Sequence, residues 1–180
     1  ADDPKAPWNR YAGSASVIKA VLCAALYPNV ASLDEAGGSA AGRPRWRDSK
    51  MEVAIHPASV NKEAARFQYP FLVFHEKVKT TRVYIRECTA VSPYALLLFG
   101  GSLQVLHREG IVLVDGWVRL KAPAQLAVLV KELRGALDRL LIEKIEKPGA
   151  DMSATSMSVI DTIAKLLSDE DAEGLGQQQQ

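Results

Sequence analysis

The sequence predicts a mainly β fold with a helical annex. Short runs rich in β-branched and aromatic residues, each bounded by turn residues, predict strands. About five strands with a helix inserted after the third is the layout of a five-stranded OB-fold barrel. Amphipathic patterns lie on both sides of the strands, so we expect N-terminal and C-terminal α-helices to flank the barrel. The predicted strands are residues 50–56, 69–77, 81–89, 103–107 with 110–115, and 117–121.

The first helix is predicted just after the N-terminal residues. Apolar side chains recur at helical spacing between Ser14 and Pro28. Ser14 or Ser16 can cap the helix, and Pro28 ends it. We therefore assign residues 1–31 to a helical segment that needs another surface to pack against.

A loop is predicted at residues 32–50, because this stretch is rich in Gly, Ser and Pro and lacks periodicity. Its basic end could contact nucleic acid, or it could simply be solvated. The residues of this secondary basic loop are Arg43, Arg45, Trp46, Arg47 and Lys50.

The predicted OB-fold spans residues 51–122 and includes a short helix. The segment from Ser92 to Gly101 is too apolar for a loop. Pro93 suits the first turn of a helix, and the two glycines at the end of the segment suit its C-terminus.

Packing helices are predicted at residues 123–169. Apolar residues recur every three or four positions after Pro123, and we expect this stripe to pack against the barrel and the first helix. A second helical pattern follows, with Ser153 or Thr155 as its cap. Residues 170–180 are acidic and polar and predict a disordered tail. The stripe consists of Leu126, Leu129, Val130, Leu133, Leu137, Leu140 and Leu141.

Charge is distributed unevenly along the 180 residues, although the net charge is only +1. Residues 43–86 contain ten Lys or Arg against four Asp or Glu, whereas residues 143–180 contain three against eight. Such asymmetry suggests a basic face for a polyanion and an acidic end that stays away from it.

Compartment and catalysis are constrained mainly by missing patterns. Cys23 and Cys88 have no paired spacing and predict buried thiols in a reducing compartment. No apolar run approaches the ~20 residues of a membrane span, and the first residues do not form a signal peptide. We therefore expect a nuclear or cytoplasmic protein, with no membrane partner.

No catalytic residue, metal site or cofactor is predicted. Glycines between Gly37 and Gly42 have the spacing of a phosphate-binding loop, but Arg43 and Pro44 stand where Lys and Ser or Thr are required. The three histidines are scattered, and no Ser or Cys has the sequence context of a nucleophile. We expect no ATPase activity from this chain.

Cations cluster between two of the predicted buried strands. Lys77, Lys79 and Arg82 surround the pair Thr80 and Thr81. The cluster is either a solvated hairpin turn or a phosphate-binding edge. Lysines neutralise phosphates, and hydroxyl groups fix the register of a nucleic acid.

Three motifs, "LYPNVA" at 26–31, "HPASVN" at 56–61 and "FHEKVKTTRVYIRECTAVSP" at 74–93, closely resemble the C-terminal region of DEAH/RHA-type RNA helicases. The resemblance covers about residues 8–146 and is strongest to the RNA helicase A and G-quadruplex-resolving branch. It implies the end of a ratchet domain, an OB-fold and packing helices. The two ATPase domains of the family lie upstream, so the resemblance implies an excised fragment.

The resemblance also implies RNA-binding residues. His56, Ser59 and Asn61 match positions at the RNA channel, but Pro57 and Ala58 replace the larger polar residues of the RNA helicase A type. The hairpin motif implies the same role for a second group of residues, namely Lys77, Lys79, Thr80, Thr81 and Arg82.

Two functions remain open from the sequence. The first is an RNA-binding accessory module that guides single-stranded or structured RNA, including G-quadruplexes, alongside the upstream helicase domains. The second is a protein-interaction platform for a helicase activator. Salt dependence distinguishes them, because phosphate binding weakens steeply with ionic strength.

Overall fold

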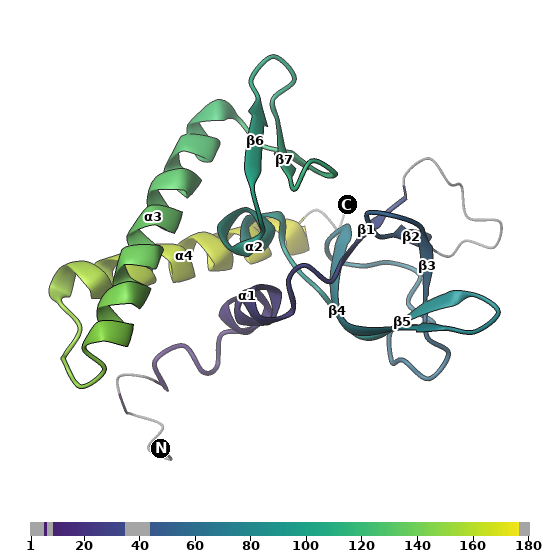
Figure 1. Cartoon of the computed structure of the whole chain (residues 1–180), viewed down its shortest axis with the longest axis horizontal. Helices are drawn as coiled ribbons and strands as arrows, with labels where there is room; N and C mark the ends of the chain where they lie inside the picture. Colours follow the sequence, from purple (N-terminus) through teal and green to yellow (C-terminus); the bar gives the residue numbers. More distant parts are fainter. Residues whose placement is uncertain (1–5, 7–8, 35–43, 177–180) are drawn as a thin grey trace.

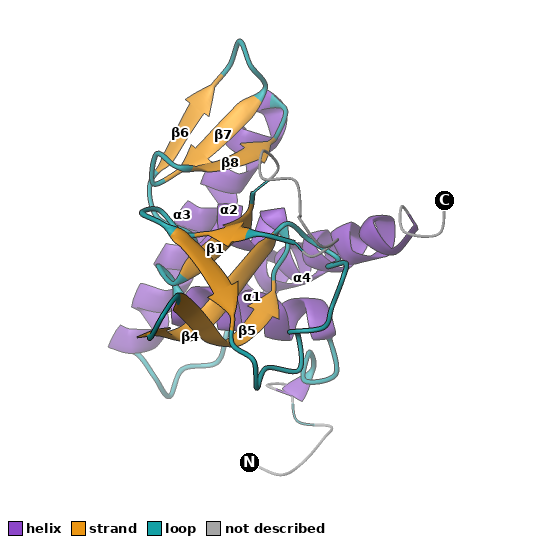
Figure 2. Ribbon diagram, turned by 90° about the vertical axis from the view of Figure 1, so that its right-hand side faces the viewer, coloured by secondary structure: helices purple, strands orange, loops and turns teal. Residues whose placement is uncertain are grey.

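The computed structural model describes residues 6, 9–34 and 44–176. The described chain has three parts: a β-barrel at the right of Figure 1, four helices at the left, and a three-stranded sheet at the top. Figure 2 shows the sheet above the barrel, with helices behind both. The predicted barrel flanked by helices is confirmed.

The barrel is a closed ring of five strands in the order β1-β2-β3-β5-β4. All neighbours pair antiparallel except β3 and β5, which pair in parallel. Closure gives each barrel strand a partner on both sides over at least part of its length. The strands are β1 (Val30–Leu33), β2 (Trp46–Arg47), β3 (Glu52–Ile55), β4 (Phe71–Lys79) and β5 (Val83–Ala90).

Two of the five barrel strands differ from the predicted ones. β1 and β2 lie where the sequence predicts the end of a helical segment and a loop. The predicted strands after residue 102 instead form a separate antiparallel sheet of β6 (Leu103–Leu106), β7 (Ile111–Val114) and β8 (Val118–Lys121). An alternating pattern identifies a strand but not its partner, and β1 and β2 are too short to show such a pattern.

The first two helices begin as predicted. α1 (Ala15–Leu26) has Ser14 as its N-cap, and α2 (Pro93–Phe99) has Ser92 as its N-cap and Pro93 in its first turn. The Ser92 hydroxyl accepts a hydrogen bond of 3.1 Å from the Ala95 amide. Each cap satisfies a backbone donor that the helix itself cannot pair.

The two long helices are α3 (Ala124–Glu146) and α4 (Ala154–Gly176). α3 packs mainly against α2 and α4, and Val130 and Leu133 share a core with Phe71 and Val73 of the barrel strand β4. The apolar stripe is buried at Val130 and Leu133, but Leu129 is 46% and Leu141 50% exposed. A stripe of every third or fourth residue is wider than the contact that two neighbouring helices make.

The prediction of a disordered tail from residue 170 is wrong through Gly176, the end of α4. Residues 177–180 lie outside the described chain. Two acidic side chains tie this end of α4 to the rest of the structure. Asp171 accepts hydrogen bonds from the Tyr69 hydroxyl and the Gln68 amide, and Glu170 accepts one from the Tyr94 amide. An acidic, polar composition predicts disorder only for a segment whose side chains find no hydrogen-bond partners in the folded protein.

Two hydrophobic cores share strand β4. Leu72 and Phe74 point into the barrel, where they meet Trp46 and Ile85. Phe71 and Val73 point the other way, into the core formed with the helices and the three-stranded sheet. Both thiols are free and buried, as predicted.

No helix in the described part of the chain is long and apolar enough to cross a bilayer.

We expect Leu133→Asp to unfold the helical core, because Leu133 is 8% exposed and belongs to the core that β4 shares. Truncating a buried leucine to alanine already costs about 2–5 kcal/mol, and a buried unpaired carboxylate costs more. Thermal denaturation followed by circular dichroism measures the effect. Leu129→Asp on the same helix is the control and should melt near the wild-type temperature; equal melting of both variants contradicts this packing.

Candidate nucleic-acid interface

A surface of aromatic and basic side chains lies on the outer face of the barrel. The His56 and Tyr84 rings meet edge to face with centroids 5.7 Å apart. His56 Nε2 lies 3.3 Å from Arg86 Nη2, and Arg86 forms a 3.2 Å ion pair with Glu76. These residues come from the end of β3 and from the paired strands β4 and β5. We call His56, Tyr84 and Arg86 the outer platform.

The hairpin between β4 and β5 continues from this platform. Lys79 pairs with Val83 at the end of the ladder, and the Thr80 amide donates a 2.9 Å hydrogen bond to the Arg82 carbonyl. Lys79, Thr80, Thr81 and Arg82 are all exposed. Neither Lys79 nor Arg82 has an ion-pair partner in the part of the chain described. Both cations are therefore available to an anion.

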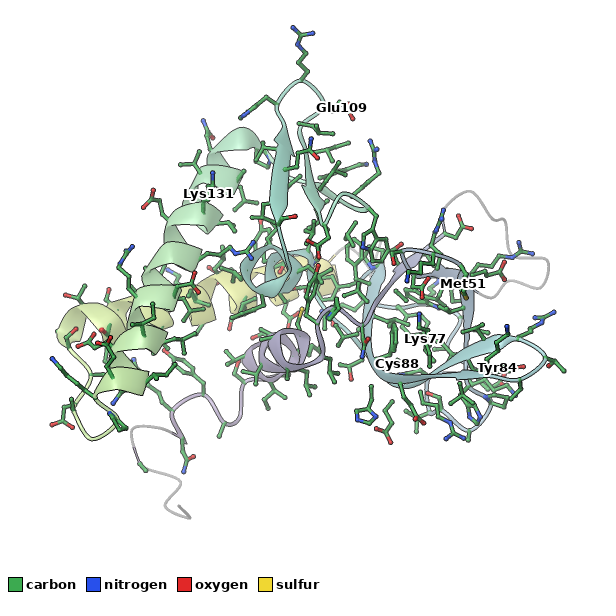
Figure 3. All side chains as sticks on the ribbon, viewed as in Figure 1. Met51, Lys77, Tyr84, Cys88, Glu109 and Lys131 are labelled. Carbon is green, nitrogen blue, oxygen red and sulfur yellow. The ribbon has the colours of Figure 1, made fainter. Side chains whose placement is uncertain are left out.

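Lys77 has a different environment. Its ammonium group forms an ion pair with Asp48, whose side chain is only 6% exposed. Lys77 lies opposite Ile85, a core residue of the barrel, and Figure 3 shows it inside the ring of barrel strands. The predicted hairpin cations thus have two environments: Lys79 and Arg82 lie in solvent at the end of the hairpin, and Lys77 is committed to an internal carboxylate.

A local change in the ladder turns Lys77 inward. Phe74 faces the barrel interior, so strict alternation would turn Glu76 inward and Lys77 outward. Glu87, which lies opposite His75, has a φ of 50°. This left-handed conformation is uncommon outside glycine and rotates the strand. Beyond it, Ile85 and its partner Lys77 face inward, and the pair of Glu76 and Arg86 faces outward.

Asp48 is held in its ionised form by several donors. Burial alone raises the pKa of this carboxyl, but hydrogen bonds from Lys77 and from the amides of Lys50 and Met51 outweigh burial and lower the pKa below its usual value. The carboxylate joins β4 to the turn between β2 and β3. Lys77 therefore stabilises the barrel.

Ser59 and Asn61 anchor a loop. The side-chain amide of Asn61 donates a 2.7 Å hydrogen bond to the Cys88 carbonyl. The backbone amide of Asn61 donates a 3.3 Å bond to the Ser59 hydroxyl. His56 Nδ1 accepts a 3.1 Å bond from the Ala58 amide. The structure thus places His56 in the outer platform. Ser59 and Asn61 instead hold the loop that follows His56 against β5.

The secondary basic loop is only partly a surface. Trp46 is 1% exposed and packs edge to face on Phe67 within the barrel core, so its predicted contact with nucleic acid is corrected. An aromatic ring of this size contributes more as buried apolar area than on a solvated loop. Arg45, Arg47 and Lys50 are exposed. Arg43 lies outside the described residues.

Two family models cover most of the chain. The oligonucleotide/oligosaccharide-binding (OB)-fold model matches residues 18–103, and the model for the C-terminal domain in RNA helicases matches residues 110–169. The chain is 47% identical over 152 residues to the chloroplastic DExH-box ATP-dependent RNA helicase DExH4 of Arabidopsis thaliana. The aligned region covers 81% of this chain and 11% of that protein. The chain belongs to the family of OB-fold and C-terminal domains of DExH-box RNA helicases.

Other relatives agree with this assignment. The chain, which we call the helicase segment (residues 1–180), is 41% identical over 161 residues to DExH1 of Arabidopsis thaliana. The aligned region covers 89% of the segment and 16% of that protein. It is 43% identical over 150 residues to the human ATP-dependent DNA/RNA helicase DHX36, covering 81% of the segment and 15% of that protein. The segment therefore spans only a small part of the length of these relatives.

Sequence reasoning missed Tyr84 and Arg86 in this helicase segment. Both lie within a run that predicts a buried strand, and the alternation of Tyr84 and Arg86 with the buried Ile85 is the signal that could have placed them outside. No group of three His, Cys, Asp or Glu side chains suited to a metal occurs among the residues described. The arrangement suits binding of an anionic, aromatic ligand such as a nucleic acid.

We expect Lys77→Met to destabilise the helicase segment by about 1–3 kcal/mol, because Asp48 is left buried without its cation. The expected loss is below that of a fully buried pair because Lys77 is 37% exposed and partly screened by water. Urea denaturation measures the free energy of unfolding. Lys79→Met is the matched control, since it removes an exposed lysine two positions away; equal midpoints for the two variants would show that Lys77 does not stabilise the barrel.

The lowered pKa of Asp48 also predicts a pH dependence. A carboxyl whose pKa is lower in the folded than in the unfolded state contributes stability above its unfolded pKa of about 3.9, and this stability is lost as pH falls through the folded pKa. We expect wild type to be more stable than Asp48→Asn at pH 7, with the difference shrinking below about pH 4. Denaturation of both proteins between pH 3 and pH 7 measures it, and a constant difference would contradict the assignment.

Proposed function

We propose that this chain is an RNA-binding accessory module of an ATP-dependent RNA helicase. The observation that supports the proposal is the exposed hairpin, where Lys79 ends the two-stranded ladder and Arg82 lies in the turn that follows. Cations on a fixed scaffold lose less conformational entropy on binding than cations on a loop. Single-stranded or structured RNA is the proposed ligand.

The two kinds of side chain have different roles in this proposal. Lys79 and Arg82 neutralise phosphates, and the Thr80 and Thr81 hydroxyls bond to phosphate or sugar oxygens. Tyr84 and His56 offer ring surface to an unstacked base, and stacking of this kind tolerates any base. Arg86, 3.3 Å from His56 Nε2, adds a further positive charge beside the ring. The proposal assigns no catalysis to the chain, so ATP hydrolysis is left to other domains of a parent helicase.

A second candidate function is docking of protein through the helices. Apolar residues line a groove of about 480 Å³ between α1, α2, α3 and α4. Val21 at this groove is 60% exposed and Leu141 50% exposed. A patch of this kind on a helical surface is typical of a protein contact. Other domains of a helicase polypeptide are the proposed occupant, and an activator protein is the alternative occupant that the sequence already suggested.

The preferred RNA structure and the compartment are further proposals. A G-quadruplex ligand is suggested by the resemblance of the sequence motifs to the G-quadruplex-resolving branch of the helicases. Two free, buried thiols suit a reducing nucleus or cytoplasm. One relative is named as chloroplastic, so imaging of the tagged full-length protein should compare all three compartments.

We expect Lys79→Ala combined with Arg82→Ala to weaken binding of single-stranded RNA of every sequence to a similar degree. If two phosphate contacts are lost, the slope of log affinity against log salt should flatten by about 1.4, taking ~0.7 per phosphate. Fluorescence anisotropy with labelled oligonucleotides at several salt concentrations measures both quantities.

The control removes two exposed cations elsewhere, Lys131→Ala with Arg139→Ala on α3. This variant has the same net charge but should keep the wild-type slope. If the hairpin variant is folded and binds RNA as the wild type does, the hairpin is not the RNA contact. Binding of a partner protein that is insensitive to salt would then favour the docking function.

A further inference from the structure

A second concave surface lies between the barrel and the three-stranded sheet. It is a cleft of about 670 Å³, within the ~300–1,000 Å³ range of sites for small ligands. Its walls come from β1 and β2 on one side and from β7 and β8 on the other. Figure 2 shows these strands facing each other, with β8 above β1. The cleft does not include any residue of the hairpin or the outer platform.

Cations line both walls of this cleft. Arg47 lies on β2, and Arg119 and Lys121 lie on β8. Arg119 forms a 3.1 Å ion pair with Glu109 at the rim. Arg47 and Lys121 have no ion pair within the described part of the chain, and both are exposed. Two positive charges therefore face the cleft without an acidic partner.

The acidic residues of the cleft do not cancel these charges. Asp48 lines it but is already neutralised by Lys77 and by backbone amides. Asp34 is the other acidic lining residue. With Asp48 paired to Lys77 and Arg119 paired to Glu109, the remaining charged lining residues are Arg47, Lys121 and Asp34, which sum to one positive charge.

The floor of the cleft is apolar. Trp117 and Ile111, at the three-stranded sheet, line it together with Leu33, Phe71 and Pro93. Trp117 is half-buried, so part of its indole surface is accessible. An acidic peptide would match only the cations, whereas a nucleotide has both an aromatic base for the floor and a phosphate for the rim.

We propose that this cleft binds one nucleotide unit of a single-stranded RNA, with the base against Trp117 and the phosphate at Arg47 and Lys121. The ligand class rests on the proposed function, but the site uses different strands from the hairpin. Arginine suits the phosphate because its planar guanidinium donates two parallel hydrogen bonds. In this proposal the cleft is a second RNA contact. It lies beside β1 and β2, which are not neighbours of β5 in the barrel.

Tryptophan fluorescence tests the proposal directly. Uridine 5′-monophosphate and an eight-nucleotide oligouridylate are titrated into the whole chain, and the expected result is quenching that disappears in Trp117→Phe. Arg47→Ala with Lys121→Ala should weaken the affinity for the mononucleotide at least tenfold. Lys79→Ala with Arg82→Ala should leave mononucleotide quenching unchanged while weakening the oligonucleotide.

Controls separate this proposal from the proposed function. Circular dichroism melting shows that the cleft variant is folded, and Lys131→Ala with Arg139→Ala removes the same charge elsewhere. No quenching by either ligand, or equal quenching in wild type and the cleft variant, overturns the cleft proposal even if the hairpin variant loses RNA binding. Equal displacement by a polyglutamate peptide overturns it in favour of an acidic protein. Loss of mononucleotide binding in the cleft variant alone supports it even if the hairpin proves inactive.

Discussion

Burial of both faces of β4 is the constraint on which the rest of the structure depends. Leu72 and Phe74 fill the barrel, while Phe71 and Val73 fill the helical core. A strand covered on both faces reads as a continuous apolar run, and β4 has one at its beginning. Because the same strand continues into the hairpin, the hairpin cations are attached to two cores at once. This rigidity distinguishes the hairpin from the basic segment that ends at Lys50.

The end of β4 carries two lysines in different environments. Lys77 and Lys79 share a face of the strand, because side chains alternate along it. Lys77 pairs with the buried Asp48, and Lys79 lies in solvent at the last position of the ladder. A buried carboxylate without its cation is costly, so the internal pair fixes where the strand turns. The position of Lys79 at the end of β4 therefore depends on the ion pair between Lys77 and Asp48.

The sequence predicted most of the fold but less of the site. Helix spacing and the serine caps located α1 and α2, because these signals are local. Barrel membership is not local: β2 is two residues long, and its pairing depends on Trp46 finding a core. The resemblance to helicases identified the hairpin, but it could not show that Lys77 faces Asp48. That orientation depends on the twist at Glu87, which no residue type specifies.

The acidic end of the chain gives the charge asymmetry a structural meaning. Asp161 on α4 accepts hydrogen bonds from Tyr11 and Arg10, and Asp171 on the same helix accepts one from Tyr69. The hydrogen bond to Asp161 raises the pKa of Tyr11, and burial together with the hydrogen bond to Asp171 raises the pKa of Tyr69. These two carboxylates are therefore held against the segment before α1 and the segment before β4. An acidic tail free to fold back could pair with the basic side chains of the barrel, whereas carboxylates fixed in this way leave Lys79, Arg82 and Arg47 exposed.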